Sequence, residues 1–179
     1  GLLLYNCSEY YETFLAALKM RMVPFNINYR YVGAELSYLL DNADCEALVY
    51  HRSMAGVVRE VLPALPLVKV AIEVDDGGEG WERAQPYEAA LAASAPAPRT
   101  ARQPDDYHLM YTGGTTGLPK GVICHVAPWS TGLTAMFATN VLGLPSAPMS
   151  VEQLVATAQA LHAKGVVPVV MPASPLMHT

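Results

Sequence analysis

Short apolar runs separated by longer amphipathic stretches dominate the first part of the chain. Three of these runs predict buried strands: Leu2–Tyr5, Ala47–Tyr50 and Val68–Val74. Two further runs, His108–Tyr111 and Gly121–Cys124, lie on either side of a loop that is rich in glycine and threonine. Continuous apolar runs of this length are typical of strands that are covered on both faces, as in a parallel sheet.

The stretches between the first strands have apolar residues three or four positions apart, which is the spacing of one helical face. They predict a helix from an N-cap at Ser8 to Pro24, with Phe14, Leu15, Leu18 and Met22 on its apolar face. They also predict a helix over Val32–Asn42 and another around Val57–Leu62 that Pro63 closes.

The last third of the chain has its own helix and strand signals. Ser150 and Gln153 have the spacing of a capping box and predict a helix that ends near Gly165. The apolar run Val166–Met171 predicts a final strand. Pro128 disfavours a helix that begins directly after the Gly121–Cys124 strand.

Strands that alternate with amphipathic helices predict an α/β fold in which helices cover mainly parallel sheets. The 179 residues are enough for one domain with a substantial core. A stretch rich in alanine and proline from Ala92 to Arg102 predicts a connector between two subdomains, over residues 92–106. The apolar start at Gly1 and the lack of a polar tail after Thr179 lead us to expect a piece of a longer protein.

Composition and charge exclude several classes of protein. A hydrophobic content of 52% with 15% charged residues excludes general disorder. Eleven basic residues against sixteen acidic ones exclude nucleic-acid binding as the main role. No apolar run approaches the ~20 residues of a transmembrane helix, and from this sequence we expect no signal peptide. The three cysteines are far apart and odd in number, which favours reduced thiols in a cytoplasmic protein.

Residues 111–121 form the one loop whose composition predicts chemistry. They read Tyr-Thr-Gly-Gly-Thr-Thr-Gly-Leu-Pro-Lys-Gly, with four glycines, three threonines and one lysine. Glycines let backbone N–H groups approach an anion closely, and threonine hydroxyls add further donors. Lys120 supplies a positive charge for phosphate oxygens. The loop is therefore predicted to bind phosphate.

The two commonest phosphate-binding motifs do not fit this loop. Counted from Gly114, the Walker A pattern would need a glycine where Pro119 stands and a hydroxyl where Gly121 stands. The dinucleotide-binding pattern fails because Gly113 and Gly114 are adjacent. Since a predicted strand follows Lys120, the loop connects two strands rather than a strand and a helix.

The loop resembles the phosphate-loop motif of the adenylate-forming (AMP-binding) superfamily. This superfamily includes acyl- and aryl-CoA synthetases, luciferases and the adenylation domains of peptide synthetases. Two other stretches are similar to fatty-acyl-CoA synthetases: Val23–Tyr50, and Pro175–His178, which resembles a short Pro/His motif beside the acyl pocket. The resemblance implies that residues 1–179 are part of the large N-terminal domain of such an enzyme, with the C-terminal domain absent.

The resemblance also implies a reaction and its cofactors. A carboxylic acid, here a fatty acid, attacks the α-phosphate of ATP to give an acyl-adenylate and pyrophosphate, and coenzyme A then displaces AMP. Mg²⁺ accompanies the ATP, and the Thr115 hydroxyl is its candidate ligand. The candidate phosphate-binding residues are Thr112, Gly113, Gly114, Thr115, Thr116, Gly117 and Lys120. Lys120 and Thr115 are the catalytic candidates among them, and His178 is expected to line the acyl channel.

Other interpretations remain open at this point. The chain could be a truncated or degenerate relative without catalysis, or an adenylation module that loads a carrier protein instead of coenzyme A. His178 could be purely structural. The pairs Asp75-Asp76 and Asp105-Asp106 are expected to be solvated loop charges. Residues 1–179 alone are expected to be inactive, because they offer only the triphosphate side of the site.

Overall fold

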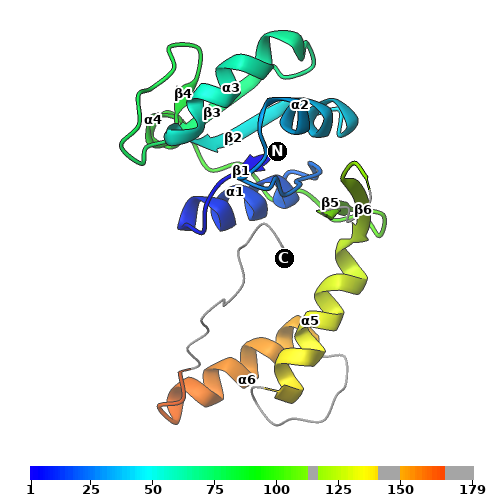
Figure 1. Cartoon of the computed structure of the whole chain (residues 1–179). Helices are drawn as coiled ribbons and strands as arrows, with labels where there is room; N and C mark the ends of the chain where they lie inside the picture. The colour runs from blue at the N-terminus through cyan, green and yellow to red at the C-terminus, as the bar shows by residue number, and fades with distance from the viewer. Residues whose placement is uncertain (113–116, 141–149, 168–179) are drawn as a thin grey trace.

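The computed structural model describes residues 1–112, 117–140 and 150–167 of the chain. In this part of the chain, a four-stranded sheet and a two-stranded hairpin are arranged with helices around and beyond them (Figure 1). The four-stranded sheet has the order β1-β2-β3-β4, and every neighbouring pair in it is parallel. Its strands are β1 (Leu2–Leu3), β2 (Ala47–His51), β3 (Val70–Val74) and β4 (Gln85–Pro86). The predicted α/β fold is thereby confirmed.

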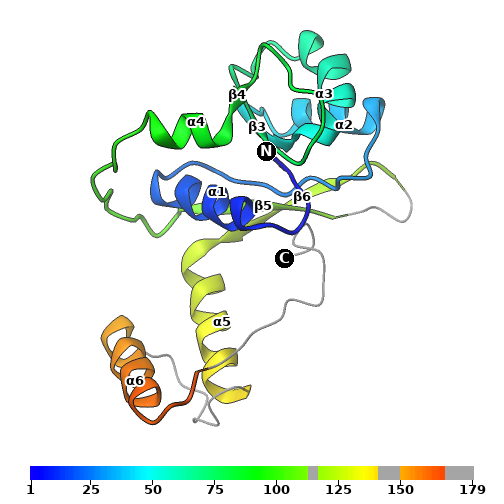
Figure 2. The same ribbon diagram turned by 90° about the vertical axis from the view of Figure 1, so that its left-hand side faces the viewer.

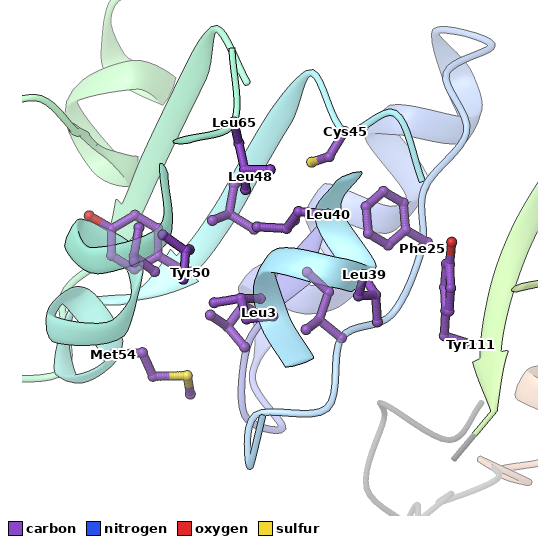
Figure 3. Packing of buried hydrophobic residues seen from close by; sticks show 14 of the residues in the cluster. Leu3, Phe25, Leu39, Leu40, Cys45, Leu48, Tyr50, Met54, Leu65 and Tyr111 are labelled. Carbon is purple, nitrogen blue, oxygen red and sulfur yellow. The ribbon is translucent and has the colours of Figure 1, made fainter. Parts of the chain in front are cut away.

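Helices cover both faces of this sheet, as its continuous apolar strands require. They are α1 (Ser8–Lys19), α2 (Gly33–Asn42), α3 (Ala55–Val61) and α4 (Tyr87–Ala92). On one face, Leu39 of α2 and Val58 of α3 join Leu48 of β2 in the larger core, part of which Figure 3 shows. On the other face, Tyr10 of α1 packs with Val49 of β2. Alternate residues of β2 therefore belong to opposite cores, which is the period-two geometry of a strand.

The second sheet is an antiparallel hairpin of β5 (Tyr107–Thr112) and β6 (Lys120–His125). The loop between two strands, predicted from the residues around Lys120, is confirmed by this pairing. Residues 93–106, between α4 and β5, contain no helix or strand. Beyond the hairpin lie α5 (Val126–Asn140) and α6 (Val151–Ala163), with α5 leading away from the sheets (Figure 2).

Local capping signals were correct at one helix and wrong at another. The Ser150 hydroxyl of α6 accepts from the backbone N–H of Gln153 at 3.2 Å, and the Gln153 side chain accepts from the N–H of Ser150 at 2.8 Å, so the capping box is confirmed. At α1, in contrast, Cys7 is the N-cap and Ser8 is the first helical residue. The Ser8 hydroxyl donates to the Glu9 carboxylate at 3.2 Å instead of capping the helix.

Two other predictions, both for the chain that follows the hairpin, need correction. Helix α5 begins at Val126, so Pro128 does not delay it. The proline lies in the first turn, where the N–H it lacks has no intrahelical partner in any case. In the predicted strand Val166–Met171, Val166 and Val167 are not in a strand, and the remaining residues lie outside the described part of the chain.

The aspartate pairs are more than solvated charges. The Asp76 carboxylate accepts from the backbone N–H of Ser53 at 2.8 Å and from its hydroxyl at 2.5 Å. Asp106 accepts from the Arg21 guanidinium at 2.8 Å and from the N–H of Gln103 at 3.0 Å. One aspartate of each pair thus fixes a loop against a distant element.

Candidate phosphate-binding hairpin

The hairpin brings the two ends of the glycine- and threonine-rich loop together. In the β5–β6 register, Thr112 is the partner of Lys120, and Tyr111 is the partner of Gly121. Thr112 and Lys120 are both exposed. A hydroxyl and an ammonium group therefore begin and end the loop on neighbouring strands, where one ligand can contact both.

The described structure includes three of the predicted site residues. Thr112 ends β5, Lys120 begins β6, and Gly117 lies exposed in the loop between them. The other predicted residues lie outside the described residues: Gly113, Gly114, Thr115, Thr116 and His178. A Cβ added at Gly117 would meet no described atom within 4 Å.

Gly121 has a packing reason to be glycine. A Cβ at this position would lie 3.2 Å from the Tyr111 ring, which covers the Gly121 backbone from the neighbouring strand. The ring is buried and also contacts Phe25, with 5.9 Å between ring centroids (Figure 3). Burial raises the pKa of Tyr111, which keeps its hydroxyl protonated. That hydroxyl donates to Oδ1 of Asn42 in α2 at 2.8 Å.

A second buried side chain holds the main chain where the loop begins. Asn26, only 4% exposed, accepts from the Tyr111 N–H at 2.8 Å through Oδ1 and donates to the Tyr111 carbonyl at 3.4 Å through Nδ2. Asn26 was not among the site residues predicted from the sequence. One signal was present: Asn26 is a lone amide between Phe25 and Ile27, both of which are buried.

The other end of the loop is tied to α2. The Tyr38 hydroxyl donates to the Pro119 carbonyl at 3.4 Å, and Pro119 itself is buried. Pro119 directly precedes Lys120. Helix α2 thus contacts the hairpin at both ends of the loop, through Tyr38 and Asn42, and neither contact was predicted.

The electrostatics of the hairpin favour an anion. Among the residues that the structure describes, ion pairs are made by Arg21 and Arg52, and Lys120 takes part in none of them. An exposed, uncommitted ammonium beside a hydroxyl suits phosphate oxygens. Within the described ranges, no group of three His, Cys, Asp or Glu side chains could hold a metal ion.

Two clefts lie away from the hairpin loop. One, of about 130 Å³, lies beside Tyr107 at the opposite end of β5 from Thr112. The other, of about 640 Å³, lies between the end of α1 and the 96–102 segment. No helix in the described ranges is both long and apolar enough to cross a membrane.

Comparison with known sequences identifies the relatives of the chain. The model of the AMP-binding enzyme family matches residues 1–176. The medium-chain acyl-CoA ligase Mig of Mycobacterium avium is 48% identical over 126 residues, which cover 69% of this chain and 23% of that protein. The 3-oxocholest-4-en-26-oate–CoA ligase of Rhodococcus rhodochrous is 44% identical over 126 residues, which cover 66% of this chain and 22% of that protein. The chain thus spans less than a quarter of the length of these two relatives.

Solved structures show the same fold. The anthranilate CoA ligase AuaEII, in complex with anthranoyl-AMP, superposes with a TM-score of 0.70 at 24% identity, over 80% of this chain and 28% of that one. The Brucella canis acyl-CoA synthetase superposes with a TM-score of 0.62 at 20% identity, over 81% of this chain and 26% of that one. The strands and helices of the described structure are therefore arranged as in part of an acyl-CoA ligase.

Proposed function

The chain belongs to the AMP-binding enzyme family, and we propose that it is part of an acyl-CoA ligase that activates a fatty acid with ATP and transfers it to coenzyme A. The observation that carries the proposal is the hairpin, which places exposed Thr112 and Lys120 at the two ends of a loop with phosphate-binding composition. The acyl-CoA ligases among the relatives support the same reaction class. Residues 1–179 would then form part of the large N-terminal domain, with 92–106 as the connector between its subdomains.

In the proposed first step, a carboxylate oxygen of the acid attacks the α-phosphorus of ATP. The new bond gives the acyl-adenylate, and the bond to the β-phosphate oxygen breaks to release pyrophosphate. Negative charge therefore grows on the β- and γ-phosphates as they leave. Lys120, Thr112 and the backbone N–H groups of the loop are the donors that would stabilise this charge.

The proposed contribution of this chain to Mg²⁺ binding is the Thr115 hydroxyl. The ion would arrive with the ATP phosphates and contact this hydroxyl. When bound, Mg²⁺ neutralises phosphate charge. Gly113, Gly114, Thr116 and Gly117 would complete the phosphate contacts.

The proposal also covers the transfer of the acyl group to coenzyme A and the cellular location of the protein. The coenzyme A thiol would attack the acyl carbonyl carbon and release AMP, with His178 lining the acyl channel. We propose the cytoplasm as the location, supported by the free thiols Cys7, Cys45 and Cys124.

The first experiment measures exchange of labelled pyrophosphate into ATP by the full-length protein, with short, medium, long and aromatic acids. We expect Lys120→Ala to lower the rate by about 10- to 1000-fold, because one preorganised cation is lost from a charged transition state. Lys164→Ala, at the exposed C-cap of α6, is the matched control and should exchange normally. An unchanged rate in Lys120→Ala would refute the phosphate role.

The acceptor is tested separately by chromatography of the products. With coenzyme A present, free acyl-CoA should form together with AMP. Acyl groups found only on a carrier protein would instead assign the chain to a carrier-loading module. Absence of exchange with every acid would favour a degenerate relative without catalysis.

A further inference from the structure

We propose that Asn26 is a positioning residue for the phosphate-binding loop, and that α2 braces both ends of that loop through Tyr38 and Asn42. This inference rests on the proposed function of the hairpin. It assigns a role in the reaction to side chains that would touch neither ATP nor the acid.

The position of Asn26 between the two sheets is the first argument. On one side, the main chain around Asn26 pairs with β1: Leu2 N–H donates to the Phe25 carbonyl at 3.0 Å, and Ile27 N–H donates to the Leu2 carbonyl at 3.0 Å. On the other side, Leu109 N–H of β5 donates to the Pro24 carbonyl at 3.0 Å. The 24–27 segment therefore joins the four-stranded sheet to the hairpin.

The parallel pairing on the β5 side does not continue regularly at Asn26. In a regular parallel ladder, the next donor along β5, the Tyr111 N–H, would bond to the main-chain carbonyl of residue 26. Here it bonds to the side-chain Oδ1 at 2.8 Å, and Nδ2 of the same amide faces the Tyr111 carbonyl at 3.4 Å. The side chain of Asn26 thus replaces a neighbouring strand for one residue of β5.

Only an amide of this length suits both contacts. Asparagine presents one acceptor and one donor, which match the N–H and the carbonyl of a single peptide residue. A carboxylate has no donor for the carbonyl, and an apolar side chain leaves both groups of Tyr111 without this partner in a buried site. The two hydrogen bonds to the Tyr111 backbone therefore explain why residue 26 is an asparagine.

The contact reaches the catalytic candidates through Tyr111. Thr112 follows Tyr111 directly in the chain, and the Tyr111 ring lies on Gly121, which follows Lys120. A fixed Tyr111 backbone therefore holds Thr112 and Lys120 in place at the two ends of the loop. The Tyr38–Pro119 and Tyr111–Asn42 hydrogen bonds, at 3.4 and 2.8 Å, tie the same unit to α2.

The expected result of loosening this brace is a defect in the use of ATP. Displacement of about 1 Å in a charged binding group can reduce a rate by up to about 100-fold. In the full-length protein, we expect Asn26→Leu to lower kcat/KM for ATP about 10- to 100-fold in pyrophosphate exchange. The KM for the acid should change less than threefold, which corresponds to a free-energy difference of about 0.7 kcal/mol.

Matched variants separate positioning from mere stability. Leu48→Ala removes a fully buried side chain of β2 and should lower the melting temperature at least as much as Asn26→Leu, while leaving kcat/KM for ATP near that of the unmodified protein. Tyr38→Phe removes one hydroxyl and should raise the KM for ATP several-fold without a large change in melting temperature. Asn42→Ala should act similarly, and Asn42→Asp, which keeps the acceptor for Tyr111 at an exposed position, should restore normal kinetics.

The outcomes decide between the two proposals. If the unmodified protein exchanges pyrophosphate but folded Asn26→Leu, Tyr38→Phe and Asn42→Ala all keep its kcat/KM for ATP, the positioning role is wrong and the proposed function stands. If Asn26→Leu does not fold, the Tyr38 and Asn42 variants decide the matter in the same way. If the unmodified protein shows no exchange with any acid, the proposed function itself fails.

Discussion

The first α/β unit, made of strands β1–β4 and helices α1–α4, and the β5–β6 hairpin differ in how they are held in place. In the first unit, helices cover both faces of the parallel sheet, and Leu3 and Leu48 are completely buried (Figures 1 and 3). In the hairpin, β5 packs against the first unit, but Val122 and Ile123 of β6 are 43% and 60% exposed within the described structure. Thr112 and Lys120, which are proposed to bind ATP, therefore lie on the less buried of the two regions.

This difference separates stability from positioning. The first unit is stabilised mainly by burial of apolar surface, which is strong but without direction. The ends of the hairpin loop are tied to it by a few hydrogen bonds, which have direction and set the place of individual groups. Substitutions in the first unit should therefore change stability, whereas substitutions at the hairpin contacts should change the use of ATP.

The largest expected effect on stability is from Leu48→Ala in β2. Removal of a fully buried leucine side chain should lower the free energy of unfolding by about 3 kcal/mol, because it loses apolar contacts and leaves a cavity. Chemical denaturation of the full-length protein measures this loss. Leu67→Ala, at a half-exposed loop position, is the control and should change stability by less than about 0.5 kcal/mol.

The proposed separation of stability from positioning would be wrong if Leu48→Ala also changed the KM for ATP at a temperature where the variant is fully folded. Such a result would mean that the core of the first unit transmits displacement to the hairpin. We expect the KM for ATP to be unchanged.

An intermediate effect is expected at Glu73, a buried carboxylate of β3. It accepts from the Tyr50 hydroxyl at 3.3 Å, from Arg52 Nε at 3.2 Å and from the Trp81 N–H at 3.0 Å. Burial and the adjacent Glu73 raise the pKa of Tyr50, so its hydroxyl remains a donor. Glu73→Ala should lower the free energy of unfolding by about 2 kcal/mol, because it leaves these donors without the carboxylate.

The neighbouring Asp75 provides the control for this variant. It pairs with Arg52 Nη1 at 2.8 Å, but its side chain is 64% exposed. Asp75→Ala should therefore change stability by less than about 1 kcal/mol, as for most exposed ion pairs. The same denaturation experiment measures both variants. Equal losses in the free energy of unfolding would show that burial does not make the Glu73 contacts stronger than the exposed Asp75–Arg52 pair.

The smallest effect is a pH dependence that involves one histidine in each region. Burial lowers the pKa of His51, although the charges of Asp76 and Glu9 partly oppose the shift, and burial lowers the pKa of His108. Below the ordinary histidine pKa of 6.5, the unfolded chain binds these protons more readily than the folded chain. Stability should therefore fall as the pH decreases from about 7 to 5, by at most about 1.4 kcal/mol per pH unit for each histidine.

The test is a series of unfolding midpoints across this pH range. His51→Gln and His108→Gln should each flatten the dependence, because each variant removes one histidine whose pKa is lowered by burial. A protein that became more stable on acidification through this range would contradict the assignment of both histidines as neutral in the fold.

Local sequence patterns predicted much of the fold because they report local physics. Apolar runs predicted β2 and β5, helical spacing predicted α2, and the Ser150 capping box was correct. The N-cap of α1 was wrong because Cys7, not Ser8, has the extended backbone that precedes the helix. The start of helix α5 was missed because a proline is tolerated in the first turn of a helix but not further inside it. The sequence alone did not show that Pro128 lies in the first turn.

By itself, the sequence determined the composition of the loop, its place between two strands and the family to which it belongs. It did so because residues 111–121 are contiguous and their chemistry is local. Only the tertiary structure decided what holds that loop. Asn26 and Tyr111 are 85 positions apart, and Tyr38 and Pro119 are 81 apart. Such pairs form only when separate elements pack, and no periodicity within either segment specifies the partner.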